Sequence, residues 1–219
     1  MKTVDIANIF KTKLKNKEYT LDRTGCRTIE IIGASFEADK PSIFGIPNDE
    51  YIQKEIHWYD TQSLNINDLD EPPPKQWQLS ASPDGYINSN YGYLIFSRDN
   101  NEQYQNCFEE LVKNSNSRRA SMIYIRPSIW HEYNAQGKID FIWTNSVTYY
   151  IRGNILQGVV QMRSNDVVYG YKNDYAWQQT VATRLQDDLA SNGLPTDDIK
   201  LHWQVQNLHV YERHFDLVK

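Results

Sequence analysis

Apolar residues recur at helical spacing in several parts of the chain. Near the N-terminus Val4, Ile6, Phe10 and Leu14 fall on one face of a helix, and basic residues fall on the other. The same criterion predicts four helices, over residues 3–17, 48–60, 104–112 and 174–189. In the last of them an acidic first turn precedes the apolar positions, as is typical of a helix N-terminus.

Stretches rich in β-branched and aromatic residues predict the strands. These stretches cover residues 27–36, 121–125, 141–152, 155–162 and 201–215. Gly153-Asn154 is a credible hairpin turn between two of them, and the proline-containing stretch 67–75 is predicted to be a loop. No repeat or linker divides the chain. We therefore expect one α+β domain over residues 1–219, with strands from both ends of the chain.

Composition and charge exclude some partners. Of the 219 residues 40% are hydrophobic and 23% are charged, and the net charge is −5. This balance argues against duplex nucleic acid as a partner, because neutralising its phosphates needs a basic surface. It leaves room for a small anion in a local arginine cluster. The N-terminus has no apolar leader and no apolar run could span a membrane, so we expect a cytoplasmic protein without a membrane partner.

The cysteines and aromatic residues are less decisive. Cys26 and Cys107 have neither metal-site spacing nor the pattern of a disulfide framework, which fits a reducing compartment and predicts no bound metal. The 15 Tyr and 6 Trp residues could stack on a flat ligand or simply fill the core.

Arginines stand in unusual settings. Arg23 lies in a turn before a strand, Arg118 and Arg119 form a tandem pair before another, and Arg163 ends a strand ahead of Asn165. Guanidinium groups offer bidentate geometry to a phosphate. The alternative is that these residues are surface charges held in ion pairs.

Six segments in a fixed order carry a family resemblance. They are Asp22-Arg23-Thr24-Gly25, Glu55-Ile56-His57-Trp58, Asn90-Tyr91-Gly92, Ser117-Arg118-Arg119-Ala120, Arg163-Ser164-Asn165-Asp166-Val167 and His209-Val210-Tyr211-Glu212-Arg213-His214. Together they resemble the motifs of thymidylate synthases and deoxycytidylate (dCMP) hydroxymethylases over residues 20–215. The resemblance implies a mixed β-sheet flanked by helices, and a homodimer formed through that sheet.

The resemblance also implies roles for individual residues. Arg23, Arg163 and Ser164 would bind the phosphate of a pyrimidine 5′-monophosphate, and Arg118 and Arg119 would reach the phosphate in the other subunit's site. Such an interface would be isologous. His209 and Tyr211 would hydrogen-bond the sugar 3′-hydroxyl. Trp77, Asp166 and Gly170 would contact the folate, and Glu55 would act as a general acid/base.

The base preference follows from Asp174, which with Asn173 occupies the base-recognition segment. Uracil-specific members of the family carry Asn where this chain has Asp174. A carboxyl group that faces N3 and the 4-amino group suits cytosine, whereas it clashes with the acceptor O4 of uracil. The resemblance thus points to the dCMP hydroxymethylases, among which viral enzymes share this pattern, and it implies the host cytoplasm as the location if this protein is viral. The alternative is an acid favoured by the dipole of its own helix.

The family's nucleophile is missing. Its chemistry needs a thiolate that adds to C6 of the pyrimidine, so that C5 can attack the one-carbon unit of 5,10-methylenetetrahydrofolate. The matching position is Trp143. Cys107 fits a small core residue, and Cys26 would lie at the phosphate end rather than beneath C6.

A second departure concerns the C-terminus. The family's tail continues beyond the His209–His214 segment and closes over the folate, whereas this sequence ends at Lys219, so we expect this lid to be missing or replaced. Three readings remain. They are a hydroxymethylase with an unusual mechanism, a nucleotide-binding protein without that chemistry, and a different reaction in which Glu55 or Asp174 activates water.

Overall fold

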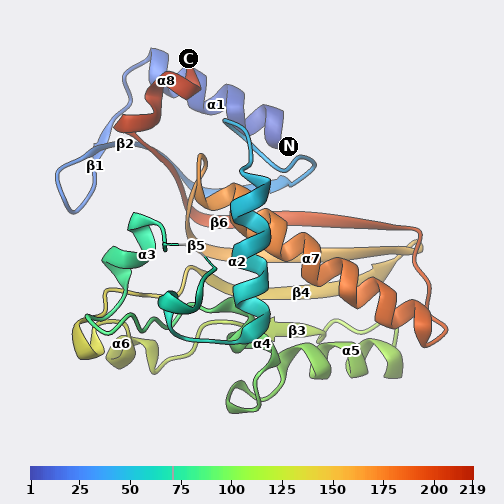
Figure 1. Cartoon of the computed structure of the whole chain (residues 1–219). Coiled ribbons are helices and arrows are strands. Elements are labelled where there is room, and N and C mark those ends of the chain that lie inside the picture. The colour runs from blue at the N-terminus through green and yellow to red at the C-terminus, as the bar shows by residue number, and fades with distance from the viewer. Residues whose placement is uncertain (71) are drawn as a thin grey trace.

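The computed structural model describes residues 1–70 and 72–219, which build on a six-stranded mixed sheet (Figure 1). The order across the sheet is β1-β2-β6-β5-β4-β3. The strands are β1 (Thr20–Leu21), β2 (Arg27–Glu37), β3 (Ser121–Ile123), β4 (Thr144–Arg152), β5 (Ile155–Asp166) and β6 (Asp198–Tyr211). All neighbours pair antiparallel except β5 and β6, which run parallel. The fold is α+β, as predicted, and strands from the two ends of the chain pair at the centre of the sheet.

The strands bend at one level of the sheet. On β5 the residues Val160 and Met162 are buried, and the alternation then slips by one so that Asn165 is buried next. The paired strand β6 slips at the same level, which leaves the register between the two unchanged. On β2 the level is marked by Gly33, whose φ of +70° is the left-handed conformation that glycine adopts easily. Such irregularities re-aim side chains, and here the slip turns Asn165 toward the helices.

Helices cover one face of the sheet, with α7 running along it and α2 crossing in front of the beginning of α7 (Figure 1). The helices are α1 (Thr3–Lys15), α2 (Asp49–Thr61), α3 (Lys75–Ser80), α4 (Tyr91–Phe96), α5 (Gln103–Lys113), α6 (Ile129–Glu132), α7 (Gly170–Ser191) and α8 (Phe215–Val218). The terminal helices α1 and α8 lie together at one end of the molecule. No helix in the described ranges combines the length and apolar character that a membrane crossing would require.

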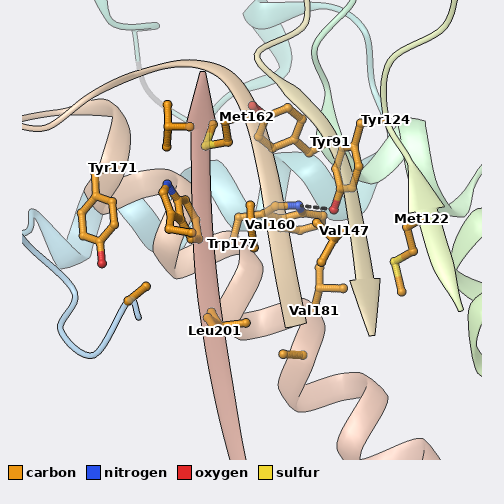
Figure 2. Close-up of a cluster of buried hydrophobic side chains, with 14 of the residues drawn as sticks. Tyr91, Met122, Tyr124, Val147, Val160, Met162, Tyr171, Trp177, Val181 and Leu201 are labelled. Carbon is orange, nitrogen blue, oxygen red and sulfur yellow. Dashed lines mark hydrogen bonds between the residues drawn. The ribbon is translucent and has the colours of Figure 1, made fainter. Parts of the chain in front are cut away.

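The core lies between α7 and the sheet (Figure 2). Trp177 is fully buried, and its indole Nε1 donates to the hydroxyl of Tyr124 at 3.2 Å. Val147, Val160 and other strand residues pack around this pair. Burial of aromatic rings of this size stabilises the layer strongly, provided that their polar atoms find partners, and here they do.

Most predicted elements are present with shifted ends. The predicted strand over 141–152 begins only at Thr144, and the register of β4 against β5 shifts between Thr144 and Ser146. The predicted strand over 201–215 stops at Tyr211, after which the chain turns helical. The predicted loop over 67–75 holds one short 3-10 helix, Ile66–Asp68, and its residue 71 lies outside the described ranges.

One shifted end changes an interpretation. The helix predicted from Asp174 begins four residues earlier, at Gly170, and its first turn contains no acidic residue. Asp174 therefore lies in the second turn of α7. The alternative that Asp174 serves the helix dipole as a first-turn acid is wrong.

Candidate functional site

The first part of the site surrounds Glu55, a buried carboxyl group on α2. Its Oε1 accepts hydrogen bonds from the Tyr51 hydroxyl at 2.6 Å and from the Trp77 indole Nε1 at 2.9 Å. Asn173 of α7 bonds the same carboxyl group. Tyr51 reaches Glu55 because residues four apart share a helix face. Burial raises the pKa of Glu55, and the three hydrogen bonds oppose that rise.

A second carboxyl group, Asp174, lies next to Glu55 although it belongs to α7. The side-chain Nδ2 of Asn165 donates to its Oδ2 at 2.7 Å, and Tyr91 also bonds it. Burial, followed by the negative charge of Glu55, raises the pKa of Asp174 to about 8. At neutral pH the pair therefore carries at least one proton. We call the set Tyr51, Glu55, Trp77, Asn165, Asn173 and Asp174 the carboxyl cluster.

Tyr91 is fixed beside this cluster by its surroundings. Thr144 Oγ1 donates to its hydroxyl at 3.0 Å. The next residue, Gly92, packs on the backbone of Tyr59, where an added Cβ would lie 1.8 Å from the carbonyl oxygen. Only glycine allows this approach, so the Tyr91-Gly92 segment holds α4 against α2.

The second part of the site centres on Arg163, which is half-buried on β5. Its Nη2 donates to the Phe141 carbonyl oxygen at 3.1 Å, and its guanidinium carbon lies 5.1 Å from the centre of the Phe141 ring. Its buried Nε has no hydrogen-bond partner. Burial lowers the pKa of Arg163, and the positive charge of Arg23 acts in the same direction. Within the described residues neither arginine has an ion pair.

His209 and Tyr211 lie on the same side of the sheet end as these arginines. In the parallel register Asp166 pairs with His209, and the amide N–H of Val167 donates to the His209 carbonyl oxygen at 2.9 Å. The rings of His209 and Tyr211 meet edge to face, 4.9 Å between centres. The charges of Asp166 and Arg23 both act on Tyr211, whose pKa is raised mainly by burial. We call Arg23, Arg163, His209 and Tyr211 the arginine cluster.

Trp143 joins the two clusters. Its carbonyl oxygen accepts from the Arg163 amide N–H at 2.8 Å, which fixes it at the start of β4. Its half-buried ring meets Trp77 edge to face, 5.8 Å between centres. An indole offers neither a nucleophile nor a base. Neither cysteine replaces it, because Cys107 is buried in α5 with its pKa raised to about 12, and Cys26 lies in the exposed hairpin loop.

Not all predicted site residues come together within one chain. Arg118 and Arg119 precede β3 at the opposite edge of the sheet from the loop that carries Arg23. Arg119 forms an ion pair with Glu110 at 3.1 Å, and Arg118 is exposed. No three His, Cys, Asp or Glu side chains gather into a metal-holding group anywhere in the described ranges.

Sequence reasoning missed three members of the site. Tyr51 could have been found, since it stands one helical turn before Glu55. Asn165 and Thr144 could not, because their contacts reach α7 and α4 across the tertiary structure.

Comparisons with known proteins identify related chains. The family model described as thymidylate synthase matches residues 6–219. The chain is 53% identical over 208 residues to the deoxycytidylate 5-hydroxymethyltransferases of Enterobacteria phages T6 and T4, over 94% of this chain and 84% of each relative. It is 30% identical over 166 residues to the thymidylate synthase of Fusobacterium nucleatum, over 74% of this chain and 57% of that protein.

Proposed function

The chain belongs to the thymidylate synthase family, and we propose that within this family it binds dCMP without the covalent chemistry of a cysteine nucleophile. The phage relatives at 53% identity are named as acting on deoxycytidylate. The observation that carries the proposal is the buried carboxyl group of Asp174, which accepts from Asn165 and whose pKa is raised to about 8 by burial and by the neighbouring Glu55.

The base preference rests on donors and acceptors. A neutral carboxyl group presents one O–H donor and one carbonyl acceptor. Cytosine presents the complementary pair, N3 as acceptor and the 4-amino group as donor, whereas uracil presents the reverse. With the acid hydrogen on the oxygen that faces N3, binding uracil would leave buried polar groups facing their like, which costs about 1–3 kcal/mol for each unsatisfied group. Asp174 thus favours dCMP over dUMP, with Asn173 and Glu55 completing the polar wall.

We assign phosphate binding to the arginine cluster. Arg163 is half-buried with an unpartnered Nε, and Arg23 brings a second positive charge near it. Two guanidinium groups without carboxylate partners repel each other, and a bound dianion would neutralise both charges. Ser164, the next residue on β5, supplies a hydroxyl to the same anion. His209 and Tyr211, on the neighbouring strand, receive the sugar hydroxyl.

The dimer completes this anion site. On the face of the sheet opposite α7, exposed Gln161 and Gln204 bond each other at 3.1 Å and no helix of the described chain covers them. A second copy packed on this face would carry its Arg118 and Arg119 toward the first copy's phosphate. The interface is isologous, and each site depends on both chains.

The fit to 5,10-methylenetetrahydrofolate rests mainly on Asp166. One of its oxygens accepts from the Val168 amide N–H at 2.9 Å, and the other can accept from a pterin N–H. Trp77 is 7% exposed and its N–H already bonds Glu55 and Tyr51, so it would offer a pterin little surface. When bound, the folate supplies the one-carbon unit, while Gly170 keeps the pterin side of the pocket open.

Trp143 stands where covalent attack on the pyrimidine would need a nucleophile. Attack at C6 requires a thiolate or an equivalent nucleophile, and the indole supplies none. Its ring instead packs edge to face on Trp77, whose indole N–H donates to Glu55. Glu55 can still bind and orient a proton at the base, but without addition at C6 the carbon C5 is not activated.

Isothermal calorimetry with dCMP and dUMP at pH 7 tests the binding proposal. We expect dCMP to bind at least about tenfold more tightly than dUMP, since at least one unsatisfied pair distinguishes them. Absence of binding by both nucleotides, or equal affinity for both, would contradict the proposal.

A further inference from the structure

The side-chain amide of Asn165 is buried between the indole of Trp203 and the carboxyl group of Asp174. It is 3% exposed. Its Oδ1 accepts from the indole Nε1 of Trp203 at 3.1 Å, and its Nδ2 donates to Asp174 Oδ2 at 2.7 Å. The slip in β5 aims it at α7, and Gly170 leaves room for it, since an added Cβ there would lie 3.0 Å from its Nδ2.

Trp203 fixes which way this amide points. An indole N–H can only donate, so the amide of Asn165 must turn its oxygen toward Trp203. Its N–H then faces Asp174, and an N–H requires an acceptor. The oxygen Oδ2 of Asp174 is therefore held as the carbonyl oxygen of the neutral acid, and the acid hydrogen is placed on Oδ1.

The other groups around Asp174 do not reverse this polarity. Glu55 on α2 and Asp166 on β5 are negative when ionised and favour a proton on Asp174. Tyr91 on α4 bonds the carboxyl group as well, and its hydroxyl can donate because Thr144 donates to its oxygen. Asn165, through its bond to the donor-only indole, is the group whose polarity is fixed toward a defined carboxyl oxygen, Oδ2.

We propose that Asn165, locked by Trp203, is a positioning residue that sets base selectivity by assigning the hydrogen of Asp174 to Oδ1. This inference rests on the proposed dCMP binding. With that assignment Oδ1–H donates to cytosine N3 and Oδ2 accepts from the 4-amino group. Without the lock the amide can rotate and present its oxygen to Oδ2. The hydrogen can then sit on Oδ2, where uracil O4 and the rotated amide oxygen are both acceptors for it, and the bare Oδ1 accepts from uracil N3–H.

The test uses Trp203→Phe with Trp177→Phe as its matched control. Both tryptophans are fully buried, and each donates its indole N–H to one buried acceptor, Asn165 for Trp203 and Tyr124 for Trp177. A merely structural role predicts similar effects for both. We expect only Trp203→Phe to lower the ratio of dCMP to dUMP affinity, by about tenfold or more. An unchanged ratio would overturn the proposal.

A second readout needs no nucleotide. Loss of a hydrogen bond to the carboxylate should raise the pKa of Asp174, which a carboxyl ¹³C NMR titration would detect in Trp203→Phe and in Asn165→Leu but not in Trp177→Phe. If the wild type binds neither nucleotide, the proposed function fails and the selectivity claim falls with it. The titration still decides the orientation of Asn165, and an unmoved pKa in Asn165→Leu would refute it.

Two further variants separate an effect on the Asn165 contacts from an effect on folding. Gly170→Ala presses on the amide without removing a hydrogen bond, so it should move the affinity ratio in the same direction but less. The double variant Trp203→Phe/Asn165→Leu should be no less selective than Asn165→Leu alone, because both residues act through one chain of contacts. Additive losses would contradict that chain.

Discussion

The carboxyl cluster and the arginine cluster differ in how far the chain itself satisfies them. In the carboxyl cluster Glu55 and Asp174 each accept hydrogen bonds from defined donors, and even the orientation of Asn165 is fixed. In the arginine cluster Arg163 has a buried Nε without a partner, and Arg23 reaches no carboxylate within the described residues.

We infer from this difference that the carboxyl cluster provides base specificity and the arginine cluster provides binding energy. The donors and acceptors of the carboxyl cluster are already oriented before a nucleotide binds, so little free energy is spent on reorienting them. This preorganised cluster therefore discriminates between the bases. Unpaired guanidinium groups gain most from an incoming anion, so the arginine cluster supplies binding energy without selecting a base. If this division is right, variants in the two clusters should affect different quantities.

The largest effect should come from Arg163→Ala. It removes a half-buried charge that, in our proposal, binds the phosphate, and hydrogen bonds to charged groups contribute about 1.5–3 kcal/mol each. We expect dCMP and dUMP affinities to fall together by about tenfold to a hundredfold in calorimetry. Arg152→Ala is the control, since that arginine bonds backbone carbonyls at the far end of β4. A fall for dCMP alone would break the division between the clusters.

Asp174→Asn should alter selectivity with less loss of total binding. Asn165→Leu is combined with it, because the intact Asn165 N–H would hold the oxygen of the new amide at the Oδ2 position. In the double variant the amide can turn its N–H toward O4 and its oxygen toward N3–H, so we expect dUMP to bind more tightly than dCMP in competition titrations. The change in preference is about tenfold or more. Asp187→Asn, on the exposed part of the same helix, should change nothing. A variant that still prefers dCMP would show that Asp174 does not read the base.

The carboxyl cluster should also make stability depend on pH. The pKa of Asp174 is about 8 in the folded chain against an ordinary value of 3.8. Between these values the folded state holds a proton that the unfolded state has lost. The free energy of unfolding should thus fall as pH rises, by about 1.4 kcal/mol per pH unit.

Urea unfolding between pH 5 and pH 8 measures this slope. Below about pH 4 both states are protonated and the contribution is constant. Glu55, whose pKa is also raised, adds a slope of the same sign. Asp174→Asn should remove the larger share, and a variant with the wild-type slope would mean that Asp174 ionises normally.

The smallest effect should come from Arg118→Ala. This exposed arginine acts, in our proposal, across the dimer and at the rim of the phosphate site, where a charge contributes about 0.2–1 kcal/mol. We expect a loss of at most about fivefold in affinity for both nucleotides, with Arg98→Ala, another exposed arginine, as the control. Mixed dimers of Arg118→Ala and Arg163→Ala chains should retain one weakened site lacking both groups and one intact site. Failure to recover any intact site would argue against a shared site.

Local patterns predicted α1, α2, β2 and the Gly153-Asn154 turn because short-range spacing decides them. The short helices α3, α4 and α6 were not predicted, since each is too short to show a period. The true start of α7 also escaped prediction. Asp166 binds the Val168 amide N–H and Gly170 packs against Asn165, and these contacts begin the helix before Asp174.

The site shows the same limit. The family motifs predicted Arg23, Arg163, Glu55 and Asp174 as site residues, and the structure brings Glu55 next to Asp174 and Arg23 near Arg163. The polarity of the Asp174 carboxyl group depends instead on Trp203, which lies 38 residues from Asn165 in the chain. No spacing rule connects those two residues, because parallel strands join them.

Release of tritium from [5-³H]dCMP measures whether the pocket activates C5 although Trp143 offers no nucleophile. Substitution at C5 must expel the C5 hydrogen, and that step requires prior addition at C6. With methylenetetrahydrofolate present, the wild-type protein should bind dCMP and release no tritium above the protein-free rate. Release above that rate by the wild type would contradict the account, because it would show that C5 is activated with tryptophan in the nucleophile's place.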